Sequence, residues 1–398
     1  MSFLIRRLGG AFSGQPEELK EKAGPAARAL IERAFAGLGS APLVDYHAHL
    51  LGLGRDGGGA EVNPAMLTWR HPIKRTFAGI FLSAAGAQGF EHLDREYAPR
   101  LARLARAFGR PMRIHLLAFD HFYNPDGTIV PARSEFYVPN ECVVRLAEQQ
   151  PDIFVPVMSV HPARRDALAE LEKWSARGVR FVKWLPCAQG MDPADPRHDE
   201  FYRLMCAHSL ILLTHAGEEQ AVKSHAAQAL GNPLRLRRPL DMGVRVIMAH
   251  CAGMGRNDDL DHPGQQAENF DLFLRMMGEE SYRGLLFGDI SAVTQVNRVP
   301  GPLLELLRRV ELHDRLVNGS DYPLPAINCI ISTRKLARLG LITPQERRSL
   351  NEIYNYNPLL FDFVLKRALR DPKTENRFPV GVFLENKGLG ARERRFAI

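Results

Sequence analysis

Eight short apolar segments recur along this sequence, and they limit its possible folds more than any other feature. Each is about as long as one β-strand, and segments with helical spacing separate most of them. Short, almost continuous apolar runs that alternate with helices are typical of a parallel sheet buried on both faces. The expected strands are residues 43–47, 112–119, 153–160, 179–185, 210–214, 244–249, 285–290 and 316–318.

Eight such units in a chain of 398 residues favour a (β/α)8 TIM barrel, which belongs to the α/β class. An open doubly wound sheet is the main alternative, but no Gly-x-Gly-x-x-Gly motif follows an early strand. We expect an N-terminal helical extension over residues 1–42, the barrel over residues 43–370 and a C-terminal tail over residues 371–398. The tail either wraps the barrel or serves contacts between subunits.

The connection between the first two strands is expected to be a long insertion. It contains an irregular stretch over residues 52–64, which is either a flexible cover for a site or a plain surface loop. Apolar residues at helical spacing follow it. Over the whole chain, helices are expected at residues 16–36, 73–84, 91–108, 143–150, 163–177, 199–208, 221–230, 268–277, 302–312 and 351–369.

Composition excludes several classes of protein. The chain is 45% hydrophobic and 24% charged, as in ordinary globular proteins, and its net charge of +7 comes with no nucleic-acid-binding motif. Its five cysteines are scattered and never form Cys-x-x-Cys, which argues against a disulfide framework and a cysteine zinc site. No apolar run approaches the ~18 residues of a membrane span. We expect a cytoplasmic homo-oligomer that acts on a small-molecule substrate and binds neither nucleic acid nor membrane.

Histidines and one aspartate stand where several of the expected strands end. His47 and His49 end the first strand, one residue apart, so their side chains share a face and their Cβ atoms lie roughly 7 Å apart. His215, His250 and Asp321 end the fifth, sixth and eighth strands. In a barrel these ends meet at one face. Imidazoles with a carboxylate are a set that zinc favours, so a metal site is predicted there.

Five short motifs carry a family resemblance. They are Asp-Tyr-His-Ala-His (45–49), Ser-Val-His-Pro (159–162), Val-Lys-Trp-Leu-Pro (182–186), Ala-His-Cys-Ala-Gly (249–253) and Gly-Ser-Asp-Tyr-Pro (319–323). Together they resemble the amidohydrolase superfamily of metal-dependent barrels, in its amidohydrolase-related (amidohydrolase 2) branch, over about residues 43–365. That branch includes hydrolases, hydratases and decarboxylases.

The resemblance implies roles for the strand-end residues. His47, His49 and Asp321 would bind a first ion, which we expect to be zinc, with manganese as the alternative. His215 would complete that site or bind a second ion, so one or two ions are expected per chain. His250 would bind the second ion or remain a free catalytic imidazole. Asp321 and His250 are the expected catalytic residues. Asp321 can take a proton from metal-bound water and pass it to the leaving group, and a free His250 can orient or deprotonate that water.

Lys183 lies inside the apolar fourth strand, and three roles are open for it. In binuclear members of the superfamily a lysine at this strand is carboxylated and bridges two ions. Burial among apolar neighbours lowers the pKa of an amine, as that reaction requires. The lysine can instead contact a substrate carboxylate without modification, or it can be purely structural.

Other residues are weaker candidates. We expect His161, Trp69, Arg70 and Tyr322 to bind substrate at the pocket. His115, Asp120 and His121 either reach the substrate or pack. Asp289 either holds a free histidine nitrogen or caps the next helix, and Glu218 with Glu219 is expected to begin a helix.

The expected function is that of a metal-dependent hydrolase, which uses metal-activated water to cleave an amide, ester or lactone of a small molecule. The alternative is a metal-dependent non-oxidative decarboxylase of an aromatic or unsaturated carboxylic acid, because that reaction uses the same ligands. A third possibility, a barrel that only binds or scaffolds, should lack one or more ligands. This chain has the complete set.

Overall fold

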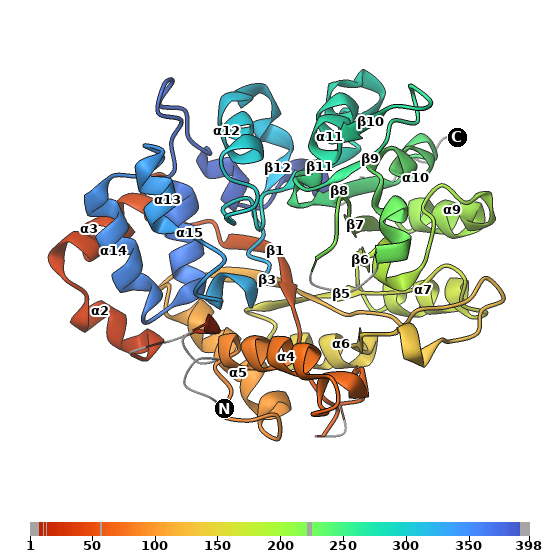
Figure 1. The fold of residues 1–398 in the computed structure, drawn as a ribbon, viewed down its shortest axis with the longest axis horizontal. Coiled ribbons are helices and arrows are strands. Elements are labelled where there is room, and N and C mark those ends of the chain that lie inside the picture. Colours follow the sequence, from red (N-terminus) through yellow and green to blue (C-terminus); the bar gives the residue numbers. More distant parts are fainter. Residues whose placement is uncertain (1–7, 11, 13, 56–57, 221–224, 391–398) are drawn as a thin grey trace.

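The computed structural model describes residues 8–10, 12, 14–55, 58–220 and 225–390. Its main sheet has eight parallel strands in the order of the chain, which confirms the barrel (Figure 1). Each strand falls within or within two residues of an expected apolar segment. The strands are β1 (Leu43–His49), β3 (Met112–Leu117), β5 (Phe154–Met158), β6 (Phe181–Trp184), β7 (Ile211–His215), β8 (Arg245–Ala249), β11 (Leu286–Asp289) and β12 (Leu316–Val317).

The barrel closes between its first and last strands by backbone hydrogen bonds. The N–H of Tyr46 donates to the carbonyl of Asn318 at 2.9 Å, and the N–H of Asp321 donates to the carbonyl of His47 at 2.7 Å. The N–H of His49 donates to the carbonyl of Tyr322 at 2.9 Å. We call this contact between residues 46–49 and 318–322 the seam. It leaves the barrel sheet without an open edge at this point.

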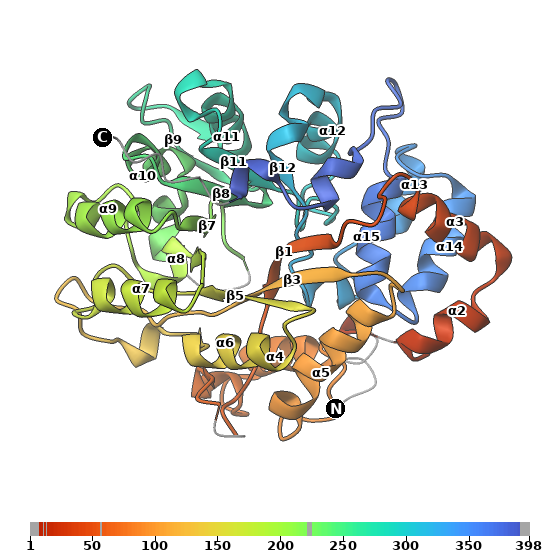
Figure 2. The ribbon, with the colours of Figure 1, turned by 180° about the vertical axis from the view of Figure 1, so that it is seen from behind.

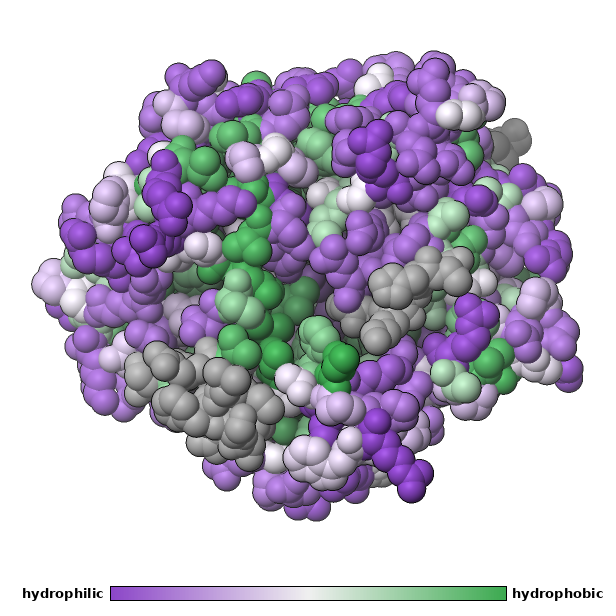
Figure 3. Space-filling model, viewed as in Figure 1, coloured by the Kyte–Doolittle hydropathy of each residue, from purple (hydrophilic) through white to green (hydrophobic). Residues whose placement is uncertain are grey.

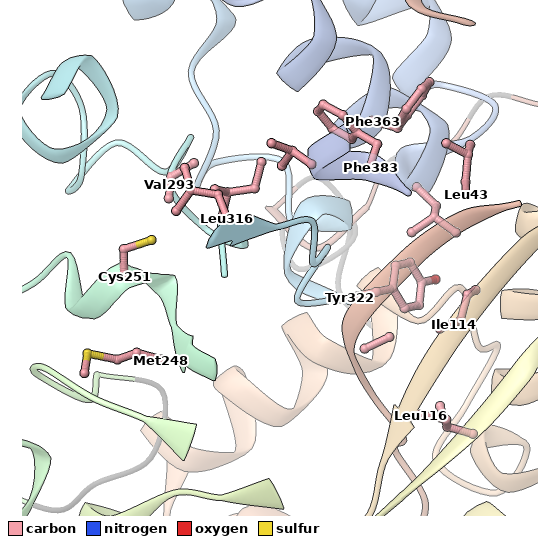
Figure 4. Packing of buried hydrophobic residues seen from close by; sticks show 14 of the residues in the cluster. Leu43, Ile114, Leu116, Met248, Cys251, Val293, Leu316, Tyr322, Phe363 and Phe383 are labelled. Carbon is pink, nitrogen blue, oxygen red and sulfur yellow. The ribbon is translucent and has the colours of Figure 1, made fainter. Parts of the chain in front are cut away.

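Side chains alternate between the inside of the barrel and the layer under the helices. The inside is filled by large apolar side chains from alternate strand positions, as in other closed barrels of eight strands. Outward-facing residues such as Leu43, Ile114 and Leu316 pack against the helices (Figure 4). The inner cluster is Val44, Tyr46, Leu117, Val157, Phe181, Ile211, Leu213, Ile247, Ala249, Phe287, Val317 and Leu389.

Helices surround the strands, as expected from the spacing of apolar residues (Figures 1 and 2). The α-helices are α2 (Leu19–Lys22), α3 (Pro25–Phe35), α4 (Pro72–Ala84), α5 (Leu93–Arg106), α6 (Asn140–Gln149), α7 (Ala167–Ala176), α8 (Pro186–Gln189), α9 (Asp199–Ala207), α10 (Arg237–Asp241), α11 (Asn269–Gly278), α12 (Gly301–Arg308), α13 (Thr333–Arg338), α14 (Pro344–Tyr354) and α15 (Pro358–Ala368).

Short elements complete the fold. Two small antiparallel ribbons pair β2 (Glu61–Val62) with β4 (Phe136–Tyr137) and β9 (Arg256–Asp258) with β10 (Gln266–Glu268). The 3-10 helices are η1 (Pro16–Glu18), η2 (Pro64–Met66), η3 (Pro131–Arg133), η4 (Pro196–His198), η5 (His225–Gly231), η6 (Pro233–Leu236), η7 (His250–Ala252), η8 (Glu280–Tyr282), η9 (Val310–Arg315), η10 (Leu324–Ala326), η11 (Val380–Phe383) and η12 (Lys387–Leu389).

Two expected helices are interrupted at prolines. The helix expected over residues 16–36 breaks at Ala23 and restarts at Pro25, and the one expected over residues 351–369 breaks before Pro358. Proline has no N–H and its ring clashes with the preceding turn, so it begins a helix more readily than it continues one. At the second break the side chain of Asn357 caps the new helix by accepting from the N–H of Leu360.

Some expectations fall partly on residues outside the described part. The helix expected over residues 221–230 includes four such residues, and residues 225–230 belong to the 3-10 helix η5. The irregular stretch over residues 52–64 and the two terminal regions also include residues that the structure does not describe. Within the described residues no helix has the length and apolar character needed to cross a membrane.

The long insertion between β1 and β3 carries exposed apolar side chains. Trp69, Ile73 and Phe77 are 80%, 64% and 57% exposed on the segment from η2 to α4. The face shown in Figure 1 is mostly hydrophilic, with apolar residues gathered near its middle (Figure 3). The guanidinium of Arg75 covers the Trp69 ring, with its carbon 4.1 Å from the ring centroid.

The C-terminal tail closes the barrel at the start of its strands (Figure 2). Leu389 belongs to the inner apolar cluster, and the Tyr46 hydroxyl accepts from the N–H of Asn386. Arg245, the first residue of β8, donates to the carbonyls of Gly388 and Gly390 at 3.1 and 2.7 Å. The described part of the tail therefore wraps the barrel, one of the two roles expected for it.

Replacing Leu389 with Ala should lower the free energy of unfolding by about 2–4 kcal/mol, because it opens a cavity in the inner cluster. Chemical denaturation of both proteins measures this difference. Lys387→Ala, at an exposed position of the same short helix, is the control and should leave stability unchanged. Equal stability of L389A and wild type would contradict the role of the tail.

Candidate metal centre

A bulge in β1 aims His47 and His49 into the barrel mouth. The register between β1 and β3 pairs Asp45 with Ile114 and Ala48 with Leu116, so Tyr46 and His47 together face one residue of β3. A bulge of this kind reorients the side chains that follow it. Val44 and Tyr46 fill the barrel interior below, while the His47 and His49 rings lie together above, with centroids 5.1 Å apart.

Asp321 meets these two histidines across the seam. Its Oδ1 lies 3.1 Å from Nε2 of His49 and 3.5 Å from Nε2 of His47. One ligand atom from each of the three residues lies within 4.8 Å of the others. Asp321 has a φ of +58°, a left-handed conformation that is uncommon outside glycine and is typical of functional sites. The structure thus brings together three of the predicted metal ligands.

His250 joins this group from the end of β8. Its Nε2 lies 3.8 Å from Oδ2 of Asp321, and its ring stacks on that of His47 with centroids 5.1 Å apart. His250, Cys251 and Ala252 all have positive φ, so the chain makes a tight left-handed turn directly after the strand. That turn directs the imidazole toward the mouth of the barrel instead of along the strand.

Asp289 and Ser291 fix the tautomers of two of these histidines. Nδ1 of His47 donates to Oδ2 of Asp289 at 2.7 Å, because a carboxylate can only accept. The Ser291 hydroxyl donates its single proton to the same oxygen at 2.7 Å, so it accepts from Nδ1 of His250 at 2.8 Å. Both rings therefore carry their proton on Nδ1 and keep the Nε2 lone pair toward Asp321. Metal-binding histidines are commonly held this way.

Two groupings of ligand-type residues include His47, and only one fits these hydrogen bonds. The grouping of His47, His250 and Asp289 would use the side where the Nδ1 protons lie. The grouping of His47, His49 and Asp321 uses the unprotonated Nε2 of His47. We therefore place the centre at the second grouping, and Asp289 holds a histidine nitrogen as one of its two expected roles.

Burial keeps the imidazoles neutral and leaves Asp321 charged. Burial, assisted by Lys183, lowers the pKa of His47 to about 4, and burial holds the pKa of His250 well below its usual range. Burial acts to raise the pKa of Asp321, but the rings of His250 and His47 while they are still protonated, and the hydrogen bond with His49, lower it, so Asp321 ionises before those two rings lose their protons. Neutral imidazoles with an ionised carboxylate are the protonation states that a metal ion requires.

Lys183 contacts the group through His47. Its side chain is buried, and Nζ is 3.2 Å from Nε2 of His47. Burial lowers the pKa of Lys183 to about 8, although the carboxylates of Asp321 and Asp289 act in the other direction. A lysine that extends from the strand into solvent is therefore excluded. Both site roles, the carboxylated bridge and the unmodified contact, match this position.

His215 and Glu219 form a pair beside His250. The His215 ring centroid is 5.3 Å from that of His250, and its Nε2 is buried and has no hydrogen-bond partner. Oε2 of Glu219 lies 3.5 Å from this nitrogen. Residues 218–220 are not helical, so the expected helix start is wrong. Glu219 is instead a buried acid that lies beside His215 at the site.

The structure does not bring every substrate candidate to the centre. His161 uses both ring nitrogens on backbone groups, the carbonyl of Gln189 and the N–H of Ala163. Tyr322 packs outward near Ile114, with its ring 5.8 Å from that of Tyr97 (Figure 4). The side chain that precedes it, Asp321, faces the site, so two adjacent residues of the seam point in different directions.

The remaining candidates lie elsewhere. Trp69 and Arg70 are exposed on the insertion, and their contact with substrate stays a prediction. His115 lies lower in the barrel, stacked on Tyr46, and His121 stacks on Tyr137. Asp120 is buried. It accepts from the N–H of His161 and from the side chains of Tyr123 and Arg164, so it joins the segment after β3 to the segment after β5.

Sequence reasoning missed Ser291, which orients His250. Its signal is the spacing Asp289-Ile290-Ser291 at the end of a strand, which places both polar side chains on the same side, toward His47 and His250. It also missed Gly319, where an added Cβ would lie 2.6 Å from Oδ1 of Asp289 and 2.7 Å from Cβ of His47. Only glycine fits at that point of the seam.

Ser291→Ala should weaken zinc affinity by about 10–100-fold, because His250 loses the acceptor that fixes its tautomer. Competition with a chromophoric chelator measures the dissociation constant. Ser281→Ala, at an exposed position, is the control. An unchanged affinity in S291A would show that the serine does not position the ligand.

Gly319→Ala should prevent stoichiometric metal uptake, because the new methyl group displaces His47 or Asp289. Gly278→Ala, whose added Cβ would meet nothing within 4 Å, is the matched control and should bind metal normally. Metal content after dialysis gives the comparison. Full occupancy in G319A would mean that the seam tolerates the methyl group.

Comparison with known proteins gives one match over most of the chain. A family model described as Amidohydrolase matches residues 44–352. No curated protein sequence matches the chain.

Solved structures of barrel proteins are similar at low sequence identity. An uncharacterized TIM-barrel protein from Bordetella bronchiseptica is 16% identical with a TM-score of 0.48, over 78% of this chain and 99% of that one. A 5-carboxyvanillate decarboxylase from Novosphingobium aromaticivorans, complexed with manganese and a nitrobenzoic acid, is 14% identical with a TM-score of 0.47, over 80% and 94%. A 4-oxalomesaconate hydratase from Rhodopseudomonas palustris is 14% identical with a TM-score of 0.41, over 78% and 95%. One fold hosts many chemistries, so the reaction has to be inferred from this chain's own residues.

Proposed function

Because the chain belongs to the amidohydrolase family, we propose that it is a metal-dependent hydrolase that cleaves an amide, ester or lactone of a small molecule with metal-activated water. The observation that supports this most is the convergence of His47, His49 and Asp321, with ligand atoms within 4.8 Å of one another. The fixed Nε2 lone pairs of His47 and His250 support it further. Metal-binding histidines commonly donate their other ring N–H in this way, which keeps the lone pair free for the ion.

The donor set fits a divalent transition ion. Imidazole nitrogens and one carboxylate are ligands that zinc takes, and the unpartnered Nε2 of His215 is a further buried donor. A first ion would be held by His47, His49 and Asp321. His215 and His250 would complete that site or hold a second ion, with Lys183 as a bridge only when it is carboxylated. We expect zinc, with manganese as the alternative.

When bound, the ion supplies a Lewis acid and lowers the pKa of water from 15.7 toward about 7. The chain's own part is to move the proton. Asp321 is ionised and presents Oδ2 toward His250, so it can take a proton from water and return it to the leaving group. His250 keeps an Nε2 lone pair at the same place and can share that task. The buried surroundings strengthen both interactions.

Asp321→Ala and His215→Ala should each lower turnover by at least about 100-fold while the protein still unfolds cooperatively, because each removes a ligand or proton acceptor. Steady-state assays with a panel of amides, esters and lactones, beside thermal denaturation, measure both properties. His92→Ala, an exposed histidine on the insertion, is the control. Full activity in D321A would remove the proposed site.

The products and the metal content decide the finer points. Release of an acid with an amine or alcohol supports hydrolysis, whereas loss of carbon dioxide from an aromatic or unsaturated acid means that the chain is a decarboxylase. One equivalent of metal per chain, with no added carboxyl mass on Lys183, would end the binuclear version.

A further inference from the structure

Arg298 lies on the loop that follows β11, and it is one of two buried arginines among the described residues. It is 6% exposed. Its side chain lies over Gly253, three residues after His250, where a Cβ would lie 3.4 Å from Cδ and 3.6 Å from Nε of Arg298. The arginine side chain therefore packs against the turn that begins at His250.

The side-chain hydrogen bond of Arg298 goes to a neutral amide and not to a carboxylate. One terminal nitrogen donates to the amide oxygen of Gln295 at 2.6 Å, and Nε is buried with no partner. No carboxylate in the described part of the chain forms an ion pair with it within 4.0 Å. Burying a charged group is costly unless an opposite charge and hydrogen bonds compensate for it.

The other buried arginine shows a different arrangement. Arg245 donates to three backbone carbonyls, those of Ser209, Gly388 and Gly390, at 2.7 to 3.1 Å. Those bonds satisfy a structural guanidinium that closes the barrel at its other end. Arg298 has no comparable set of acceptors, so packing alone does not account for its position.

Arg298 packs beside the turn that carries His250. The Gly253 position that contacts the arginine side chain also lies against the carbonyl oxygen of His250, 3.0 Å from the place of a Cβ. The buried Nε of Arg298 therefore lies next to the backbone of one of the predicted metal ligands and has no partner there.

We propose that Arg298 binds a carboxylate group of the substrate, so that the substrate is a small carboxylic acid held with its reacting bond at the metal centre. A guanidinium binds a carboxylate through two parallel hydrogen bonds, which also fixes its orientation. The negative charge of the ligand would compensate the buried cation. This inference rests on the proposed function, because it takes the group around Asp321 as the reacting centre.

A structural role for Arg298 makes the opposite prediction about stability. Loss of a satisfied structural arginine destabilises a protein, whereas loss of an uncompensated buried charge leaves stability unchanged or raises it. Arg298→Gln should therefore melt at the wild-type temperature or above it. A clear fall in melting temperature, with carboxylate binding retained, would assign the residue to packing.

Binding of acetate and benzoate, with benzyl alcohol as the neutral probe, tests the inference directly. Isothermal titration of the zinc-loaded protein should show that the better of the two carboxylates binds and that benzyl alcohol does not. R298Q should weaken that binding by about 10–100-fold, as expected for a charged hydrogen-bonded pair. Arg315→Gln, at the opposite end of the barrel where Arg315 bonds to the carbonyl of Met277, is the matched control and should bind like wild type.

Repeating the titration after chelation separates this inference from the proposed function. Carboxylate binding that persists without metal and is lost in R298Q supports the carboxylate-binding role of Arg298. A protein that takes up no zinc would contradict only the hydrolase proposal. Zinc uptake with equal carboxylate affinity in wild type and R298Q would overturn the role of Arg298 and leave the metal centre intact. Failure of both carboxylates to bind wild type would also overturn it.

Discussion

The carboxylate of Asp45 joins the first strand of the barrel to the residues after the last strand, beside the candidate site. Its Oδ1 accepts from the N–H of His47 at 3.0 Å and from the N–H of Ser320 at 2.8 Å. One oxygen thus ties the first strand to the residues after the last one. His47 carries one of these amides and Asp321 directly follows the other, so the bridge helps to fix the placement of these two residues relative to each other.

A buried ion pair lies next to the same part of the seam. Lys366 is fully buried and donates to Oδ2 of Asp362 and to the carbonyl of Gly319, both at 2.6 Å. Burial raises the pKa of Asp362 to about 6, although Lys366 acts against this rise. Breaking one partner of such a pair leaves an uncompensated charge in the interior, which is strongly destabilising. The backbone at the seam is therefore held from the helix side as well as from the strand side.

Much of the fold followed from the sequence because its signals are local. Apolar runs located the strands, and their alternation with helices indicated the barrel. His47 and His49 were recognisable by spacing, and Asp289 by its position at the end of a strand. What failed depended on tertiary contacts. Glu219 looks like a helix start, yet it is buried beside His215, and its N–H and carbonyl bond to the side chain of Gln228. The sequence did not indicate a role for Arg298, because its burial without a carboxylate partner is visible only in the folded chain.

The predicted metal ligands lie at the seam, so any metal affinity that they provide depends on the integrity of the whole barrel. His47 and Asp321 meet only when the first and last strands pair, so a chain with an open seam has lost the site. By linkage, any ion that binds the closed form alone adds its binding free energy to the stability of that form, about 2.7 kcal/mol at a hundredfold excess over the dissociation constant. A bound ion would then hold the seam closed, and metal depletion would lower the free energy needed to open the barrel there.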